Sequence, residues 1–152
     1  MSKLPQKVSE EEADELVEEA EKVRPNTFST FTESSVGAAI LTDSGDIHAA
    51  PYFESVIQGL GTCAERNAVG SAVAAGDYKF KAVAVVGQQE EPITPCGACR
   101  QILAEFKEIA QHDIAIIMEG QNGDRQVEML SDMIPESLGG RRSRSRPGTV
   151  LV

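Results

Sequence analysis

The chain of 152 residues is long enough for one domain with one core, so a separate regulatory or substrate domain is not expected. Its composition, 41% hydrophobic and 25% charged, is that of an ordinary globular protein rather than a disordered or membrane-spanning one. A net charge of −10 disfavours sequence-independent binding to nucleic acid, which needs a basic surface, and favours small-molecule substrates.

The predicted elements begin with an acidic helix. Ser9 and Glu12 form a capping-box pattern, and apolar residues then recur on one helical face. The pattern predicts a helix over residues 9–24 that ends before Pro25. Its many carboxylates are expected to form a solvated surface.

Strands and helices then alternate. Runs rich in β-branched residues predict strands, and segments with apolar residues three or four apart predict helices. In chain order the predicted elements are a hairpin of strands over 36–41 and 47–53, a helix over 63–75, a strand over 81–86, a helix over 97–110, a strand over 113–118, an extended piece near Val127 and a weak helix broken at Pro135. This alternation predicts an α/β fold with three layers, α/β/α.

The three cysteines are expected to form a metal site. Their odd number argues against a disulfide framework, and the chain shows no signal peptide or apolar span, so we expect a cytoplasmic, reducing location. Cys63, Cys96 and Cys99 fall at predicted helix starts, where the helix dipole lowers thiol pKa values. Three thiolates leave the fourth position of a tetrahedral Zn²⁺ open for water. Neither His48 nor His112 has ligand spacing, and neither is expected to bind metal.

The residues around the cysteines match a zinc deaminase motif. The tripeptide CAE starts at Cys63, and PCGAC follows one helix and one strand later and ends at Cys99; this is the three-cysteine form of the motif. Zinc lowers the pKa of a water, and Glu65 is expected to take the proton for attack on a carbon such as C4 of cytosine. Glu65 then returns protons to the ring and to the departing ammonia. Arg66 is expected to offset the thiolate charge, and Arg100 is a weaker candidate for that role whose alternative is a surface position on its helix.

The sequence resembles the small cytidine deaminase family through the segments VGAAILTDSGDI, TCAERNAV, FKAVAVV and TPCGACRQILAEF. The resemblance covers about residues 31–135 and implies a five-stranded mixed sheet, a homotetramer and hydrolytic deamination of cytidine or deoxycytidine. The residues to which it gives roles are Cys63, Cys96 and Cys99 as ligands of Zn²⁺, Glu65 for proton transfer, Arg66 at the thiolates, and the backbone of Ala64 and Thr94 beside the base and the leaving amine.

The substrate-binding positions depart from this family. At the ribose-binding motif the chain keeps Glu54 but has Tyr52 where an asparagine is usual, and Ser34 and Leu138 replace aromatic pocket residues. Tyr52 and Glu54 are expected on one face of a strand, with Tyr52 in contact with the ribose or its replacement. The pocket therefore also suits blasticidin S, another modified cytosine nucleoside or another aminated heterocycle.

Two further alternatives and the end of the chain complete the interpretation. A structural zinc module would have a saturated, water-free metal, and a nucleic-acid-editing deaminase would need a basic face and stacking aromatics, which are only 5% of this chain. We expect an aminated nucleoside or base as the partner, with no nucleic acid and no membrane. We divide the chain into a zinc domain, residues 1–138, and a basic tail, residues 139–152, whose arginines suit an anionic substrate.

Overall fold

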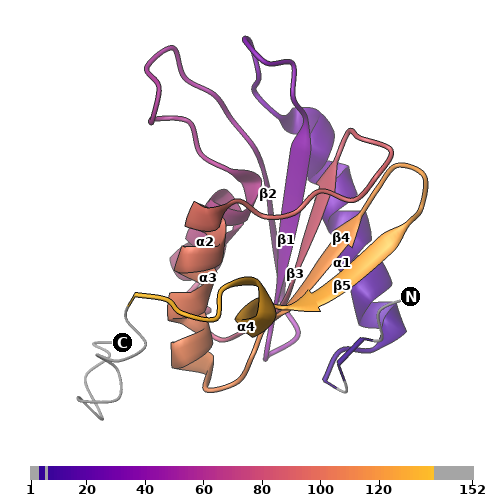
Figure 1. Ribbon diagram of the computed structural model, residues 1–152, viewed down its shortest axis with the longest axis vertical. Helices are drawn as coiled ribbons and strands as arrows, with labels where there is room; N and C mark the ends of the chain where they lie inside the picture. The colour runs from indigo at the N-terminus through magenta and orange to yellow at the C-terminus, as the bar shows by residue number, and fades with distance from the viewer. Residues whose placement is uncertain (1–3, 6, 139–152) are drawn as a thin grey trace.

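The computed structural model describes residues 4–5 and 7–138, and within them one mixed sheet lies between two helical layers (Figure 1). The strands are β1 (Val36–Thr42), β2 (Ile47–Pro51), β3 (Phe80–Gly87), β4 (Ala115–Glu119) and β5 (Arg125–Met129). They lie in the order β2-β1-β3-β4-β5, with β3 and β4 parallel and the other neighbours antiparallel. The five-stranded mixed sheet is confirmed. The predicted basic tail lies outside the described residues.

Four α-helices accompany the sheet in the described part of the chain. They are α1 (Glu10–Val23), α2 (Ala64–Ala74), α3 (Gly97–Ala110) and α4 (Leu130–Met133), with a short 3₁₀ turn at Arg24–Asn26. The capping box of α1 is confirmed: Ser9 Oγ accepts the N–H of Glu12 at 3.1 Å, and the Glu12 carboxylate accepts the N–H of Ser9 at 2.9 Å. Among these helices none combines the length and apolarity needed to cross a membrane. The cytoplasmic location stays a prediction.

The sheet buries apolar side chains on both faces, which explains the nearly continuous apolar runs of its central strands. On one face Ile40 of β1 and Leu103 of α3 belong to a core beneath α2 and α3. On the other face Leu41 of β1 and Leu16 of α1 belong to a second core. Burying each such side chain stabilises the fold by about 1.5–3 kcal/mol. The three-layer α/β/α architecture is confirmed, and it fixes the starts of α2 and α3 on the same side of the sheet.

The second hairpin strand ends earlier than predicted, at Pro51 rather than at Phe53. Pro51 has no N–H for the strand ladder, and β2 is an edge strand, where proline is tolerated. Tyr52 still donates its N–H to the carbonyl of Val36 at 2.9 Å, but Phe53 forms only isolated bridges. Tyr52 and Glu54 therefore lie where the chain leaves the sheet, not within a strand.

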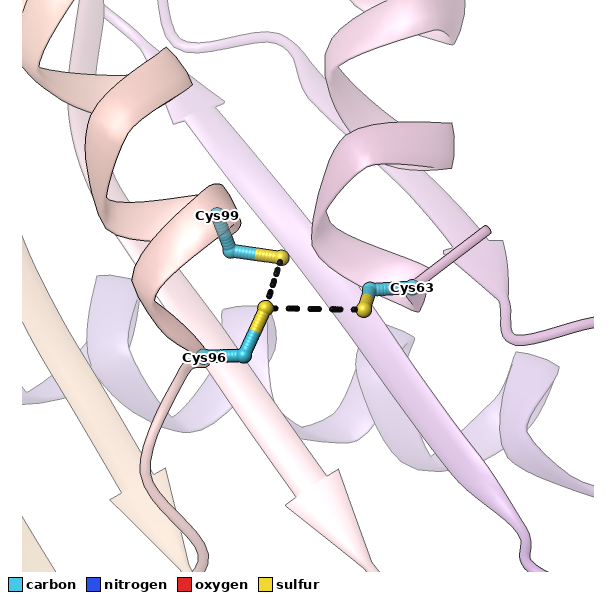
Figure 2. Close-up of side chains that lie close together, drawn as sticks. All are labelled: Cys63, Cys96 and Cys99. Atoms are coloured by element: carbon cyan, nitrogen blue, oxygen red, sulfur yellow. Dashed lines mark hydrogen bonds between the residues drawn. The ribbon is translucent and has the colours of Figure 1, made fainter. Parts of the chain in front are cut away.

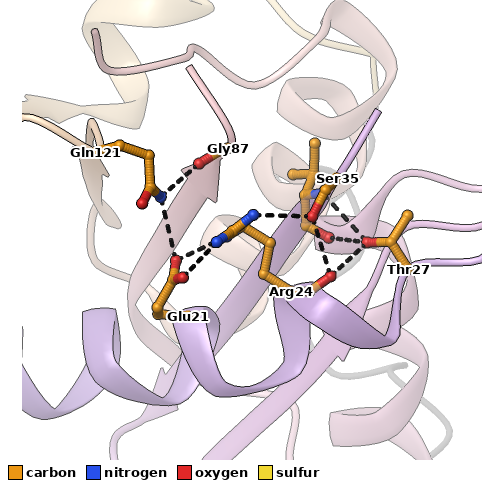
Figure 3. Close-up of polar contacts among 7 residues, drawn as sticks. Glu21, Arg24, Thr27, Ser35, Gly87 and Gln121 are labelled. Atoms are coloured by element: carbon orange, nitrogen blue, oxygen red, sulfur yellow. Dashed lines mark hydrogen bonds and ion pairs between the residues drawn. The ribbon is translucent and has the colours of Figure 1, made fainter. Parts of the chain in front are cut away.

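Hydrogen bonds hold the base of the segment that joins α1 to β1 (Figure 3). The Arg24 guanidinium donates to Ser35 Oγ at 3.0 Å and binds Glu21 at 2.6 and 2.8 Å. The Arg24 carbonyl accepts the hydroxyls of Thr27 at 2.8 Å and Ser35 at 3.2 Å. The N–H of Val36 donates to Thr27 Oγ1 at 3.2 Å. The two ends of this segment are thus fixed independently of its middle, which reaches the site described next.

Candidate active site

Three cysteine side chains meet where α2 and α3 begin (Figure 2). Cys63 is the N-cap of α2, Cys96 is the N-cap of α3, and Cys99 lies in the first turn of α3. The Cys96 sulfur lies 3.7 Å from that of Cys63 and 3.5 Å from that of Cys99, and all three lie within 4.8 Å of one another. Zn–S bonds of about 2.3 Å in a tetrahedral site separate two sulfurs by about 3.8 Å. The donor set therefore fits one zinc ion.

Charge around the thiols favours the thiolate form of Cys63. A hydrogen bond from the Cys99 thiol to the Cys63 sulfur, with smaller effects from Arg66 and Cys96, lowers the pKa of Cys63 to about 5. Arg66 Nη2 lies 3.7 Å from that sulfur. The charge-offsetting role expected for Arg66 stays a prediction. Its Nε is buried without a hydrogen-bond partner within the described chain, so this end of the guanidinium has capacity for a further acceptor.

Arg100, the weaker candidate for a role at the thiolates, is engaged elsewhere. Its guanidinium donates to the carbonyls of Pro95 at 2.9 Å and Met133 at 3.2 Å and to Thr94 Oγ1 at 2.8 Å. It therefore ties the loop before Cys96 to α4. Adjacency to a ligand in sequence does not fix the direction of a side chain, because successive residues on a helix point to different sides.

Glu65 lies in the first turn of α2, with only 4% of its surface exposed. Burial, together with the nearby Cys63 charge, raises the pKa of Glu65. Its carboxylate also interacts with the Cys99 thiol. Glu65 nevertheless falls outside the group of ligand atoms that lie close enough to share an ion. The structure therefore places a buried carboxyl group beside the metal site without making it a ligand.

Both histidines are engaged elsewhere. His48 Nε2 lies 2.6 Å from an Asp77 carboxylate oxygen, and His112 Nε2 lies 2.8 Å from one of Asp43. Neither histidine belongs to the cysteine group. The expectation that neither is a metal ligand agrees with these contacts.

A cavity of about 490 Å³ adjoins the cysteines, with Cys63 in its wall. Tyr52 and Glu54 also line it, and their side chains meet there: the Tyr52 hydroxyl donates to Glu54 Oε1 at 3.2 Å. The two side chains share a side, as predicted. Another cavity of about 500 Å³ lies against α1 and contains none of the motif residues. Only the first of these two cavities joins the metal site to a space for a ligand.

The other predicted pocket residues do not line this cavity. Ala64 is the buried first residue of α2, and Thr94 lies in the loop before α3. The N–H of Ser34 donates to Thr32 Oγ1 at 3.3 Å, and Leu138 is 80% exposed. Proximity of Ala64 and Thr94 to a base stays a prediction.

Sequence reasoning missed two parts of the cavity wall. Phe31 and Thr32 line it from the segment between α1 and β1, and residues 55–59 line it from the segment after Glu54. The first segment is held by Glu54, which accepts hydrogen bonds from Phe31 and Thr32, residues more than 20 positions away in sequence. Because neither segment has helical or strand periodicity, no local pattern pointed to them.

Comparison with known proteins connects this site to one family. Residues 10–118 match the family described as the cytidine and deoxycytidylate deaminase zinc-binding region. The chain is 33% identical over 124 residues to a cytidine deaminase from Sporosarcina psychrophila, covering 82% of this chain and 89% of that protein. It is 31% identical over 108 residues to a blasticidin-S deaminase from Bacillus cereus, covering 66% of this chain and 74% of that protein.

The fold has the same relatives. A crystal structure of a cytidine deaminase from Burkholderia pseudomallei superposes with a TM-score of 0.76 at 35% sequence identity. The match covers 82% of this chain and 98% of that chain. The sheet, the helices around it and the sequence between them are thus similar over almost the whole length of that structure.

Proposed function

The chain belongs to the cytidine and deoxycytidylate deaminase family, and from this membership we propose that it hydrolyses cytidine or deoxycytidine to the uridine product and ammonia. One observation carries the proposal. The buried carboxyl group of Glu65 lies beside three thiols that fit one zinc ion, and one of these thiols, that of Cys63, lines a cavity of about 490 Å³. A cavity of this size is typical of sites for small ligands.

Zinc is the cofactor, and Cys63, Cys96 and Cys99 are the residues that would hold it. A zinc ion with three protein ligands supplies a Lewis acid that lowers the pKa of a water molecule. Arg66 is proposed to offset the negative charge of the three thiolates, since its guanidinium already lies against Cys63.

Glu65 is proposed as the catalytic proton carrier. Its carboxylate takes a proton from the water that attacks C4 of the cytosine ring. It delivers this proton to ring nitrogen N3, then takes the proton of the hydroxyl group now on C4 and passes it to the amine, which leaves as ammonia as the C4 carbonyl forms. The raised pKa of Glu65, caused mainly by burial, suits a group that must hold a proton between these two transfers.

Backbone groups near the cysteines are proposed to orient the base. The backbone of Ala64 is proposed to contact the base, and the backbone of Thr94 to contact the leaving amine. Arg100 supports this assignment, because its bonds to Thr94 Oγ1 and to the Pro95 carbonyl fix the loop in which Thr94 lies. Arg100 is thus a positioning residue.

Two alternatives are less well supported. Blasticidin S would need the same chemistry, but the cytidine deaminase from Sporosarcina psychrophila aligns over 82% of this chain and the blasticidin-S deaminase over 66%. A purely structural zinc module would need a fourth protein ligand, and the group found in the described residues has three. The deciding experiment follows ammonia release by the zinc-loaded protein from cytidine, deoxycytidine, cytosine and blasticidin S. Turnover of blasticidin S alone, or of none of the four, would contradict the proposal.

The nucleoside is expected to be a better substrate than its 5′-phosphate. No lysine, arginine or histidine lies among the described lining residues, and Glu54, whose pKa is about 2, puts a negative charge in the wall. A phosphate with nearly two negative charges is repelled there, so kcat/KM for deoxycytidine should exceed that for deoxycytidylate at least about tenfold. The same ratio is expected for a chain that ends at Leu138. If the full chain turned over both substrates equally and the truncated chain lost its activity on deoxycytidylate, phosphate binding would instead be assigned to the basic tail.

We also propose a homotetramer. Large apolar side chains are exposed around the cavity, among them Phe31 at 60%, Val56 at 82% and Ile57 at 60%. Such a patch marks an interface more often than open solvent. Light scattering at micromolar concentration should give about four times the chain mass, and a double substitution of Val56 and Ile57 by Asp should lower it. A fully active wild-type monomer would refute the assembly.

A further inference from the structure

Glu54 lies at the centre of a hydrogen-bond network in the cavity wall. Its Oε2 accepts the backbone N–H groups of Phe31 at 2.9 Å and Thr32 at 3.4 Å. Its Oε1 accepts the hydroxyl of Tyr52 at 3.2 Å and also the hydroxyl of Thr32. We call these four residues the Glu54 network. All of them line the cavity whose wall includes Cys63.

The donors of this network occupy the whole carboxylate. A carboxylate has about four lone-pair sites on its two oxygens. Four donors from the chain use them, and Glu54 is only 8% exposed. The Thr32 hydroxyl, with smaller effects from the N–H groups and from Tyr52, lowers the pKa of Glu54 to about 2. The charged group in this wall therefore has no free site for a hydroxyl of a ligand.

The remaining wall offers only neutral groups to the sugar of a nucleoside. Beyond the network and Cys63, the lining comes from residues 55–59 and Gly61, which include Val56, Ile57 and Gln58 and no charged side chain. The reacting carbon must lie at the metal site beside Cys63. The sugar therefore extends along a wall whose single ionised carboxylate is fully engaged.

We infer that the Glu54 network fixes residues 31–32 as part of the cavity wall and does not bind sugar hydroxyls, so that cytosine nucleosides lacking the 2′ and 3′ hydroxyls are accepted nearly as well as cytidine. The inference rests on the proposed function for the position of the nucleoside. Tyr52 is the specificity-determining residue, because its hydroxyl occupies an acceptor site on Glu54 that a sugar hydroxyl would otherwise use.

The first experiment compares cytidine with 2′,3′-dideoxycytidine, by kcat/KM and by calorimetric Kd. A charge-assisted hydrogen bond changes affinity by about 10- to 100-fold, and a neutral one by about tenfold or less. The wild-type preference for cytidine should therefore stay below about tenfold. Tyr52→Phe keeps the ring and frees a site on Glu54, so it should raise this preference at least about tenfold further. Tyr78→Phe, at a different cavity, is the matched control and should change nothing.

Several outcomes separate the two claims. A wild-type preference above about tenfold, or a preference that Tyr52→Phe leaves unchanged, overturns the inference. Binding in the expected ratios without ammonia release contradicts the proposed reaction and supports the assignment of Glu54. Failure to bind either nucleoside overturns both claims.

A second experiment tests the network without any substrate. Amide hydrogen exchange at Phe31 and Thr32 should be at least about tenfold faster in Glu54→Gln, since an amide cannot accept all four donors. The Val36 amide donates to Thr27 instead and serves as the internal control, with unchanged exchange. Unchanged exchange at Phe31 and Thr32 would show that Glu54 does not hold this segment and would overturn the inference.

Discussion

Glu65→Gln should lower kcat by about 10³- to 10⁴-fold while zinc content and fold stay unchanged. The amide has nearly the shape of the carboxyl group and can occupy the same buried position, but it cannot take up and return protons. Steady-state ammonia release gives kcat, and metal analysis with circular dichroism tests the fold and the zinc. The loss should appear in kcat rather than in KM, since the group acts in the chemical steps.

The matched control for this substitution is Glu128→Gln. Glu128 lies on β5 with an exposed side chain, so the same change of charge there should leave kcat within about twofold. If kcat of Glu65→Gln stayed within tenfold of the wild-type value, the result would contradict the proton-transfer role.

Cys99→Ala should reduce bound zinc from about one ion per chain to below about 0.2, and activity with it. Two thiolates and solvent form a poor zinc site, because a catalytic site needs three protein ligands. Cys99 is completely buried, so alanine also leaves a small cavity. Cys99→Ser separates the two effects, since it nearly preserves the volume and removes the thiolate. Both variants should lose zinc in metal analysis, and full zinc with full activity in either would rule out Cys99 as a ligand.

The sequence predicted the helices and the metal site well because both depend on short-range patterns. Ser9 and Glu12 lie three residues apart, and the predicted bounds of α3 agree with the structure at both ends. The cysteines were identifiable because ligand chemistry requires particular residue types at particular spacings.

The cavity wall could not be predicted in the same way. Thr32 and Glu54 are brought together only by the completed fold, and neither lies in a periodic segment. The position of the Arg100 guanidinium could not be predicted for a related reason, since it donates to the carbonyl of Met133, which is far away in sequence. β2 ends at Pro51, which has no N–H for the strand ladder, whereas the propensity argument extended the strand to Phe53.

The two separate cores have a consequence for engineering and for divergence among relatives. The core that contains Leu16 and Leu41 lies on the far side of the sheet from the cysteines. Substitutions that pack α1 more tightly against that face would raise heat resistance while the opposite face keeps its shape. The α1 side chains of this core, such as Leu16, do not touch the cysteine face, so this layer is where a thermostable version of the protein is best sought.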